Sequence, residues 1–137
     1  MKLVRAQRGR EVFYGLLKDG VITRLAGPPY GGVEKTGEAY PLEEVRLLCP
    51  AEPTKVVCVG KNYLLHAREM QEGVPEEPLL FLKPQSAVVG PGDGIAYPAL
   101  SQRVDYEGEL AIVIGKTCYQ VGPERALEHV LGYTCLN

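Results

Sequence analysis

The sequence predicts an α+β fold that is mainly β-sheet. Eleven prolines and 16 glycines interrupt the 137 residues so often that turns and short strands are favoured over long helices. Residues 11–25 have the pattern of a β-hairpin, and residues 104–114 combine alternating acids with an apolar run that is typical of a strand. A composition of 45% hydrophobic and 23% charged residues is that of an ordinary globular protein.

The size and charge of the chain narrow the possible functions. A chain of 137 residues can bury one good core, or form a small module plus part of a larger one. Its net charge of −2 gives no electrostatic reason to expect nucleic acid or an anionic membrane as a partner. No apolar run approaches the roughly 20 residues that span a bilayer. We therefore expect neither a nucleic-acid partner nor a membrane segment.

Cysteine usage favours a reducing compartment. The four cysteines form no C-x-x-C pair, and the first five residues contain no apolar signal core. Free thiols are the expected state, and the expected location is the cytoplasm. The cysteines are Cys49, Cys58, Cys118 and Cys135.

The first fifty residues predict a small β module. Residues 11–17 and 21–25 flank Asp19-Gly20, and an Asp-Gly pair supplies the positive φ angles of a tight hairpin turn. Residues 26–40 are expected to be a loop because prolines and glycines crowd its first half. Residues 41–48 are expected to form a short amphipathic segment.

Prolines 50 and 53 mark a boundary, so the predicted domains are 1–50 and 51–137. The second domain is expected to begin with a buried strand, followed by a helix that Asn62 caps. A second apolar strand ends at Lys83-Pro84, and the glycine cluster after it is expected to be a turn. Pro123 suits the first turn of a last helix that stops at Gly132. The expected ranges are strands at 55–60 and 79–82, helices at 63–72 and 123–131, and a turn at 90–94.

Three carboxylates occupy alternate positions at Asp105, Glu107 and Glu109, directly before the apolar run 111–114. A strand would place all three on one face, with neighbours about 6.6 Å apart along the chain. Like charges this close repel unless a cation lies between them, and oxygen ligands suit Mg²⁺, Mn²⁺ or Ca²⁺ better than Zn²⁺. The alternative is a solvated edge strand whose acids discourage aggregation.

A second group of candidates consists of His66, Glu69 and Lys83. His66 and Glu69 are three residues apart, so on a helix they are neighbours, and the carboxylate would prepare the imidazole to take a proton. Lys83 lies at a strand end, where it could pair with a substrate carboxylate. The alternatives are an ordinary exposed His–Glu contact and an ordinary surface lysine. His129, late in the last predicted helix, indicates no site.

Three motifs in this order resemble the smaller bacterial-type branch of the fumarylacetoacetate hydrolase family. They are Gly60-Lys61-Asn62-Tyr63 with His66 and Glu69-Met70, then Pro78-Leu79-Leu80-Phe81-Leu82-Lys83-Pro84 with Ser86, and Asp105-Tyr106-Glu107-Gly108-Glu109-Leu110-Ala111. Gly132-Tyr133-Thr134 also fits the family. The resemblance covers about residues 55 to 137, and residues 1–50 resemble the small N-terminal module of longer members.

The resemblance implies a mixed β-roll/β-sandwich, incomplete in this chain. It also implies Mg²⁺ or Mn²⁺, with Ca²⁺ possible, held by Glu107 and Glu109, so that Asp105 leaves the expected ligand set. The family's further acidic ligand and a catalytic lysine would follow Asn137. The sequence is therefore expected to be the front half of such an enzyme.

The implied function is metal-dependent chemistry on a 2-oxo acid or its enol, either C–C bond hydrolysis or a keto–enol or double-bond isomerisation like that of 2-hydroxyhepta-2,4-diene-1,7-dioate isomerase. His66, oriented by Glu69, would move the proton, and Lys83 would bind or polarise substrate oxygens. A homodimer is expected by analogy. One alternative is an oxaloacetate decarboxylase of the same family. Another, of a different class, is a non-catalytic β module that binds Ca²⁺ or a partner protein.

Overall fold

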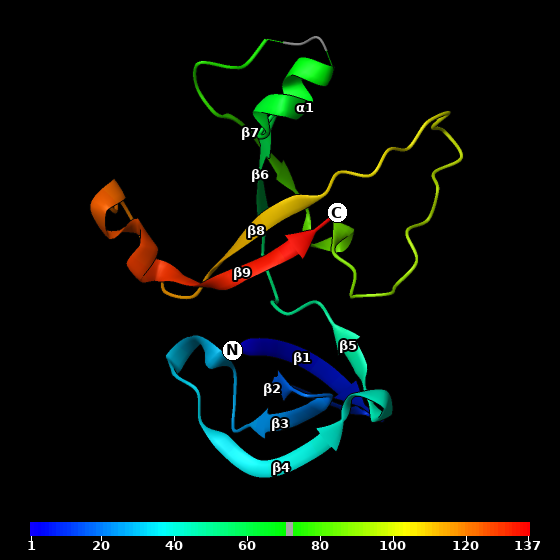
Figure 1. The fold of residues 1–137 in the computed structure, drawn as a ribbon, viewed down its shortest axis with the longest axis vertical. Helices are drawn as coiled ribbons and strands as arrows, with labels where there is room; N and C mark the ends of the chain where they lie inside the picture. Colours follow the sequence, from blue (N-terminus) through cyan, green and yellow to red (C-terminus); the bar gives the residue numbers. More distant parts are fainter. Residues whose placement is uncertain (71–72) are drawn as a thin grey trace. The chain divides into compact units, whose positions relative to one another are not determined.

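A computed structural model describes residues 1–70 and 73–137. Within these ranges the chain forms nine strands, one short α-helix and four 3-10 helices, so the prediction of a mainly β fold is confirmed (Figure 1). The chain divides into two compact units. One contains Met1–Ala51 together with Gly90–Asn137, and the other contains Glu52–Val89.

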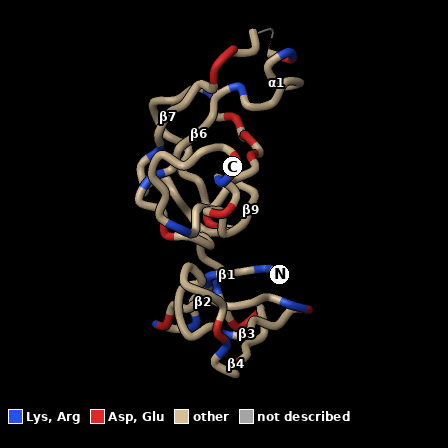
Figure 2. Tube along the Cα trace, turned by 90° about the vertical axis from the view of Figure 1, so that its left-hand side faces the viewer, with Lys and Arg blue, Asp and Glu red and all other residues tan. Residues whose placement is uncertain are grey.

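The N-terminal part is a five-stranded antiparallel sheet with the strand order β4-β3-β2-β1-β5. Lysine, arginine and acidic residues are interspersed along its strands (Figure 2). Its first four strands follow one another as a meander, and β5 returns to pair with β1. The strands are β1 (Lys2–Arg8), β2 (Glu11–Lys18), β3 (Val21–Leu25), β4 (Lys35–Pro41) and β5 (Arg46–Leu48).

The predicted hairpin at residues 11–25 is confirmed. Lys18 pairs with Val21, so the turn between β2 and β3 is two residues long. Asp19 and Gly20 have φ angles of 49° and 76°, the positive values that a tight two-residue turn requires.

The expectation of a loop throughout residues 26–40 is wrong, because β4 begins at Lys35. A polar edge strand has no apolar alternation to reveal it, and what defines β4 is its pairing with β3. The preceding residues do contain a 3-10 helix, Pro29–Gly31. The predicted amphipathic piece 41–48 divides into a second 3-10 helix, Leu42–Glu44, and strand β5.

The core of the N-terminal sheet is small and tightly packed. Ala6 and Ile22 are fully buried, and Phe13 is 5% exposed. The Phe13 ring lies 5.4 Å from the ring of Tyr40, and the Arg24 guanidinium lies 5.4 Å from the Phe13 ring centre. These contacts join strands β1 to β4 and give the sheet one well-covered face.

The predicted turn at 90–94 lies against β5. The Asp93 carboxylate accepts a hydrogen bond from the backbone N–H of Gly90 at 2.9 Å and another from the guanidinium of Arg46. A Cβ at Gly90 would lie 3.2 Å from the Leu47 carbonyl oxygen, so glycine lets the turn approach the strand closely. The Arg46 hydrogen bond and the Gly90 hydrogen bond lower the pKa of Asp93.

Strands β8 (Glu109–Ile114) and β9 (Val130–Leu136) form a two-stranded antiparallel ladder. The predicted helix at 123–131 is wrong in type and length, because Pro123–His129 is a 3-10 helix and the chain then enters β9 directly. Gly132, expected to stop a helix, lies inside that strand opposite Val113.

The second unit is a strand–helix–strand segment. It contains β6 (Val56–Gly60), α1 (Leu64–Glu69) and β7 (Leu79–Lys83), with a 3-10 helix at Gln85–Ala87. Both predicted strands are confirmed in position, but the expectation that the first is buried is wrong, because Val57 is 57% exposed. The predicted helix 63–72 is shorter at its start, where Tyr63 rather than Asn62 is the cap residue, and its predicted end at residues 71–72 lies outside the described residues.

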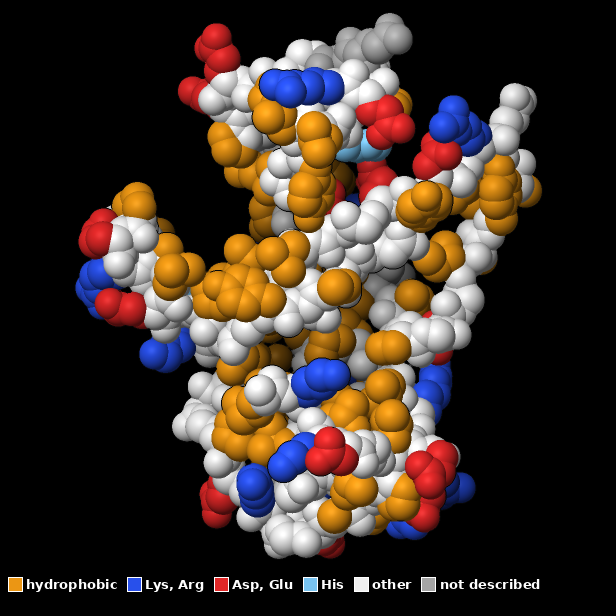
Figure 3. All heavy atoms as spheres, viewed as in Figure 1, with side chains coloured by type: hydrophobic (Ala, Val, Ile, Leu, Met, Phe, Trp, Pro, Cys, Tyr) orange, Lys and Arg blue, Asp and Glu red, His pale blue; other side chains and the backbone are white. Residues whose placement is uncertain are grey.

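Both ladders have exposed apolar faces (Figure 3). On β6–β7 the two strands direct four aliphatic side chains to one face, and the most exposed is Leu82 at 67%. On β8–β9 one face exposes Leu110, Ile112 and Tyr133, each by more than half. The four aliphatic side chains on this face of β6–β7 are those of Val57, Val59, Leu80 and Leu82.

We predict that Gly15→Ala destabilises the N-terminal sheet by about 1–3 kcal/mol. The added Cβ would lie 2.3 Å from Cγ2 of the fully buried Ile22 and 3.0 Å from the Thr23 carbonyl oxygen. Thermal and urea denaturation provide the measurement. The matched control is Gly27→Ala, whose Cβ meets nothing within 4 Å. Equal stability of the two variants would contradict this account of the packing.

We predict that the contact between Asp93 and the Gly90 N–H weakens on acidification. Because the folded pKa of Asp93 is lowered, its contribution is present above the ordinary carboxyl pKa and is lost as the pH falls through the lowered value. The measurement is the protection factor of the Gly90 amide in hydrogen exchange between pH 6 and pH 2.5. Asp93→Asn should remove the pH dependence, whereas Glu44→Gln, which breaks the exposed Arg8–Glu44 pair, should leave it unchanged.

Candidate functional site

The three alternating carboxylates do not share one strand, so that prediction is wrong. Strand β8 begins at Glu109, and Asp105 and Glu107 precede it in irregular chain. The Asp105 carboxylate accepts a hydrogen bond from Nε of Arg103 at 2.9 Å. Asp105 therefore has a local cationic partner, and the ligand pair that the resemblance implies, Glu107 and Glu109, stays a prediction.

Glu107 and Glu109 lie at the open end of the β8–β9 ladder. Glu109 pairs with Leu136, and its side chain is half-buried on the same face as Ala111 and Val113. The backbone N–H of Glu107 donates a hydrogen bond to the side-chain oxygen of Asn137 at 2.8 Å. The end of β9 thus holds both carboxylate residues in place, one by backbone pairing and one through a side chain.

The donor chemistry of this pair fits a hard divalent cation. Carboxylate oxygens are the ligands that Mg²⁺, Mn²⁺ and Ca²⁺ prefer. Two carboxylates supply only part of a shell of about six oxygens. Among residues 1–70 and 73–137, no group of three or more histidine, cysteine or acidic side chains gathers closely enough to hold an ion. Metal binding by Glu107 and Glu109 therefore stays a prediction.

Helix α1 brings His66 and Glu69 together as predicted. Nδ1 of His66 lies 3.7 Å from a carboxylate oxygen of Glu69, and the two side chains are 54% and 80% exposed. This separation exceeds hydrogen-bond distance, and an exposed pair of this kind contributes little to stability. The contact nevertheless places the carboxylate on the Nδ1 side and leaves Nε2 facing away from it.

Lys83 is not brought to this pair. Lys83 pairs with Val56 at the first residue of β6, whereas Gly60, which leads into α1, pairs with Leu79. Four residues separate the two ends of the ladder, which is about 14 Å along the strands. The Lys83 ammonium instead lies 5.8 Å from the centre of the Phe81 ring. Lys83 and the His66–Glu69 pair therefore occupy opposite ends of β6–β7.

The candidate residues are divided between the two units. Glu107 and Glu109 belong to the unit that contains the N-terminal sheet, and His66, Glu69 and Lys83 belong to residues 52–89. Each of the two units is a compact body of its own. A site that uses both groups stays a prediction.

Two residues near the candidates were not identified from the sequence. Asn137 holds the Glu107 amide, and an asparagine after a strand carries no signal for such a role. Lys61 has a φ angle of 54° at the exit from β6, where a Cβ on Gly60 would approach Leu79 to 3.0 Å. Gly60 therefore lies where a larger side chain would have little space. Lys61 has the left-handed backbone conformation, which in residues other than glycine often marks functional segments.

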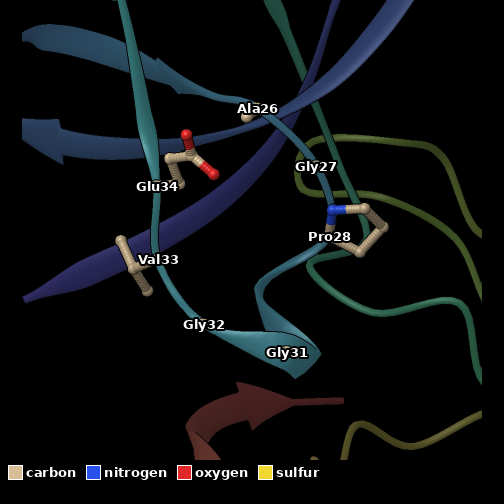
Figure 4. Close-up of a pocket in the computed structure, with 7 residues that line it drawn as sticks. All are labelled: Ala26, Gly27, Pro28, Gly31, Gly32, Val33 and Glu34. Carbon is tan, nitrogen blue, oxygen red and sulfur yellow. The ribbon is translucent and has the colours of Figure 1, made fainter.

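A hollow of about 400 Å³ lies in the loop between β3 and β4, apart from these candidates. Ala26–Pro28 form one limb of the loop and Val33–Glu34 the other, with Gly31–Gly32 at the bend (Figure 4). The Ala26 N–H donates to the Glu34 carbonyl at 2.9 Å and closes the loop. Glu34 supplies the one ionisable side chain of this lining, so the hollow has no set of converging polar groups.

None of the helices in the described residues has both the length and the apolar character needed to cross a membrane.

Comparison with known proteins connects both parts of the chain to one group of sequences. Residues 55–137 match the family profile of the fumarylacetoacetate hydrolase C-terminal domain, and residues 1–50 match a profile described as Rv2993c-like, N-terminal. The mitochondrial oxaloacetate tautomerase FAHD2A of Bos taurus is 50% identical over 95 residues, which are 69% of this chain and 30% of that protein.

Solved structures share the fold. A 5-carboxymethyl-2-hydroxymuconate delta-isomerase from Mycobacterium smegmatis aligns with a TM-score of 0.87 and 42% identity, over 98% of this chain and 53% of that one. A maleylpyruvate hydrolase from Sphingobium, in complex with manganese(II) and pyruvate, aligns with a TM-score of 0.73 and 28% identity, over 98% of this chain and 57% of that one. The chain spans about two fifths of the curated relatives that it matches and about half of these solved chains.

Proposed function

Because the chain belongs to the fumarylacetoacetate hydrolase family, we propose that it forms part of a divalent-metal-dependent enzyme that isomerises a 2-oxo acid or its enol. The observation that carries this proposal is the position of Glu107 and Glu109 at the same end of the β8–β9 ladder. The manganese(II) and pyruvate bound to the Sphingobium relative support both the class of metal and the class of substrate. The names of two other relatives, a hydroxymuconate isomerase and an oxaloacetate tautomerase, favour isomerisation.

Glu107 and Glu109 would hold Mg²⁺ or Mn²⁺ and leave further positions open. When bound, such an ion would act as a Lewis acid on the oxygens of the 2-oxo acid and stabilise an enolate. The register of the ladder pairs Glu109 with Leu136, so a residue that follows Asn137 in a longer chain would lie opposite Glu107. An acidic residue at that position would add a third carboxylate to the pair.

His66 would carry the proton in this reaction. Keto–enol isomerisation moves a proton from the carbon next to the keto group to the keto oxygen, and an imidazole can carry a proton between such positions. Glu69 lies on the Nδ1 side, so Nε2 would take the proton. The 3.7 Å contact would shorten when substrate orders the helix, as catalytic hydrogen bonds often do.

Lys83 would act in binding rather than in proton transfer. It lies at the other end of β6–β7 from helix α1, and its ammonium is held near the Phe81 ring. A cation there suits recognition of a carboxylate or other oxygen of the substrate.

We predict that Glu107→Gln and Glu109→Gln each weaken Mn²⁺ binding at least tenfold, since each removes a charged oxygen ligand. Isothermal titration with Mn²⁺, Mg²⁺ and Ca²⁺, with and without oxalate, provides the measurement. Asp105→Asn, whose carboxylate pairs with Arg103, is the matched control and should bind Mn²⁺ as the unsubstituted chain does. A site that takes only Ca²⁺ and ignores oxalate would instead favour the non-catalytic binding module.

We predict that His66→Gln lowers kcat for oxaloacetate tautomerisation by about 10²–10⁴-fold and leaves Mn²⁺ affinity unchanged, because the side chain moves a proton without holding the ion. The ultraviolet absorbance of the enol follows the reaction. Arg68→Gln, an exposed substitution on the same helix, is the control. Equal rates in His66→Gln and the unsubstituted protein would exclude the proton-transfer role.

A further inference from the structure

We propose that a clasp on strand β5 ties together the two connections of residues 52–89 and limits the motion of that unit. The clasp consists of Arg46, Gly90 and Asp93, which all belong to the unit of the N-terminal sheet. The chain leaves this unit after Ala51 and returns to it at Gly90. The clasp residues therefore lie close in sequence to both connections, Arg46 before the first and Asp93 after the second.

The Asp93 carboxylate is the centre of the clasp. One of its oxygens accepts a hydrogen bond from the Arg46 guanidinium, and the other accepts one from the backbone N–H of Gly90 at 2.9 Å. The Asp93 N–H donates to the Gly90 carbonyl at 3.1 Å and closes the turn. The Asp93 side chain is only 26% exposed, but that of Arg46 is 60% exposed, so the ion pair alone would contribute little. The carboxylate matters because it joins the strand to the turn.

Close packing at Gly90 gives the clasp a second, independent contact. A Cβ on Gly90 would lie 3.2 Å from the Leu47 carbonyl oxygen and 3.2 Å from the Leu48 Cα. Both atoms belong to the backbone of β5, which pairs with β1, and the Leu47 side chain packs against the buried core of the sheet. The turn is therefore fastened to an ordered part of the N-terminal sheet.

A unit that is attached at two nearby points has less freedom than one attached at a single point. With the clasp closed, the chain leaves for residues 52–89 just after the three-residue strand β5 and returns directly onto it. With the clasp open, the returning end would no longer be held at β5, and relative motion of the two units is then the default expectation. Residues 52–89 carry His66, Glu69 and Lys83, so the bearing of the clasp on catalysis rests on the function proposed above.

The test measures relative motion by NMR relaxation of backbone amides in the 137-residue chain. The measured quantity is the rotational correlation time of the amides in β6–β7 divided by that of the amides in β1–β3. Hydrogen exchange of the Ile22 amide, in the fully buried core, reports whether the N-terminal sheet stays folded. The experiment measures neither metal binding nor turnover, so its result and that of the function proposed above are independent.

Two substitutions open the clasp in different ways, and each has a matched control. Arg46→Gln removes the charged donor, and its control is Arg125→Gln, which breaks an exposed ion pair between neighbouring turns of one 3-10 helix. Gly90→Ala pushes the turn from β5, and its control is Gly94→Ala, whose Cβ meets nothing within 4 Å. Arg46→Lys keeps a cation that can donate to Asp93.

We expect a ratio near one in the unsubstituted chain and a fall of about twofold in Arg46→Gln and in Gly90→Ala, as the smaller unit begins to move by itself. Arg46→Lys and both controls should stay near the unsubstituted value, with Ile22 protected throughout. A ratio unchanged in both clasp variants would overturn the proposal, as would a low ratio in the unsubstituted chain. Loss of Ile22 protection together with the fall would also overturn it, because the sheet and not the clasp would then account for the motion.

Discussion

The antiparallel register between β8 and β9 is the constraint on which the proposed metal site depends. It pairs Glu109 with Leu136 and brings the Asn137 side chain to the backbone of Glu107. Side chains alternate between the faces of a strand, so a slip of one residue would move Glu109 to the opposite, more exposed face. The half-buried partners of Glu109 on its own face, Ala111 and Val113, oppose such a slip because their burial favours the observed register.

The pairing of β6 with β7 separates Lys83 from the His66–Glu69 pair. Antiparallel strands place the residue that leaves β6 beside the residue that enters β7, so helix α1 and Lys83 are separated by the full length of the ladder. The pair proposed for proton transfer and the cation proposed for substrate recognition thus occupy different places on one short unit.

Features set by local chemistry were predictable from the sequence, and features set by pairing were not. Asp19-Gly20 specifies its own turn, and a spacing of three residues makes His66 and Glu69 neighbours on any helix. Strand β4 has no apolar face and exists because β3 pairs with it. The acids before β8 alternate as a strand would, but the strand begins only at Glu109. Proline at 123 marks a helix start without distinguishing a 3-10 helix from an α-helix.

The meander of the N-terminal sheet also determines the order in which the chain can acquire structure during synthesis. Strands β1 to β4 pair with their neighbours in sequence, so most of this sheet forms by closing short, fast loops, and only β5 must return over a long distance. These residues leave the ribosome before either ladder with an exposed apolar face has been made. The N-terminal sheet can therefore form before the two ladders with exposed apolar faces emerge.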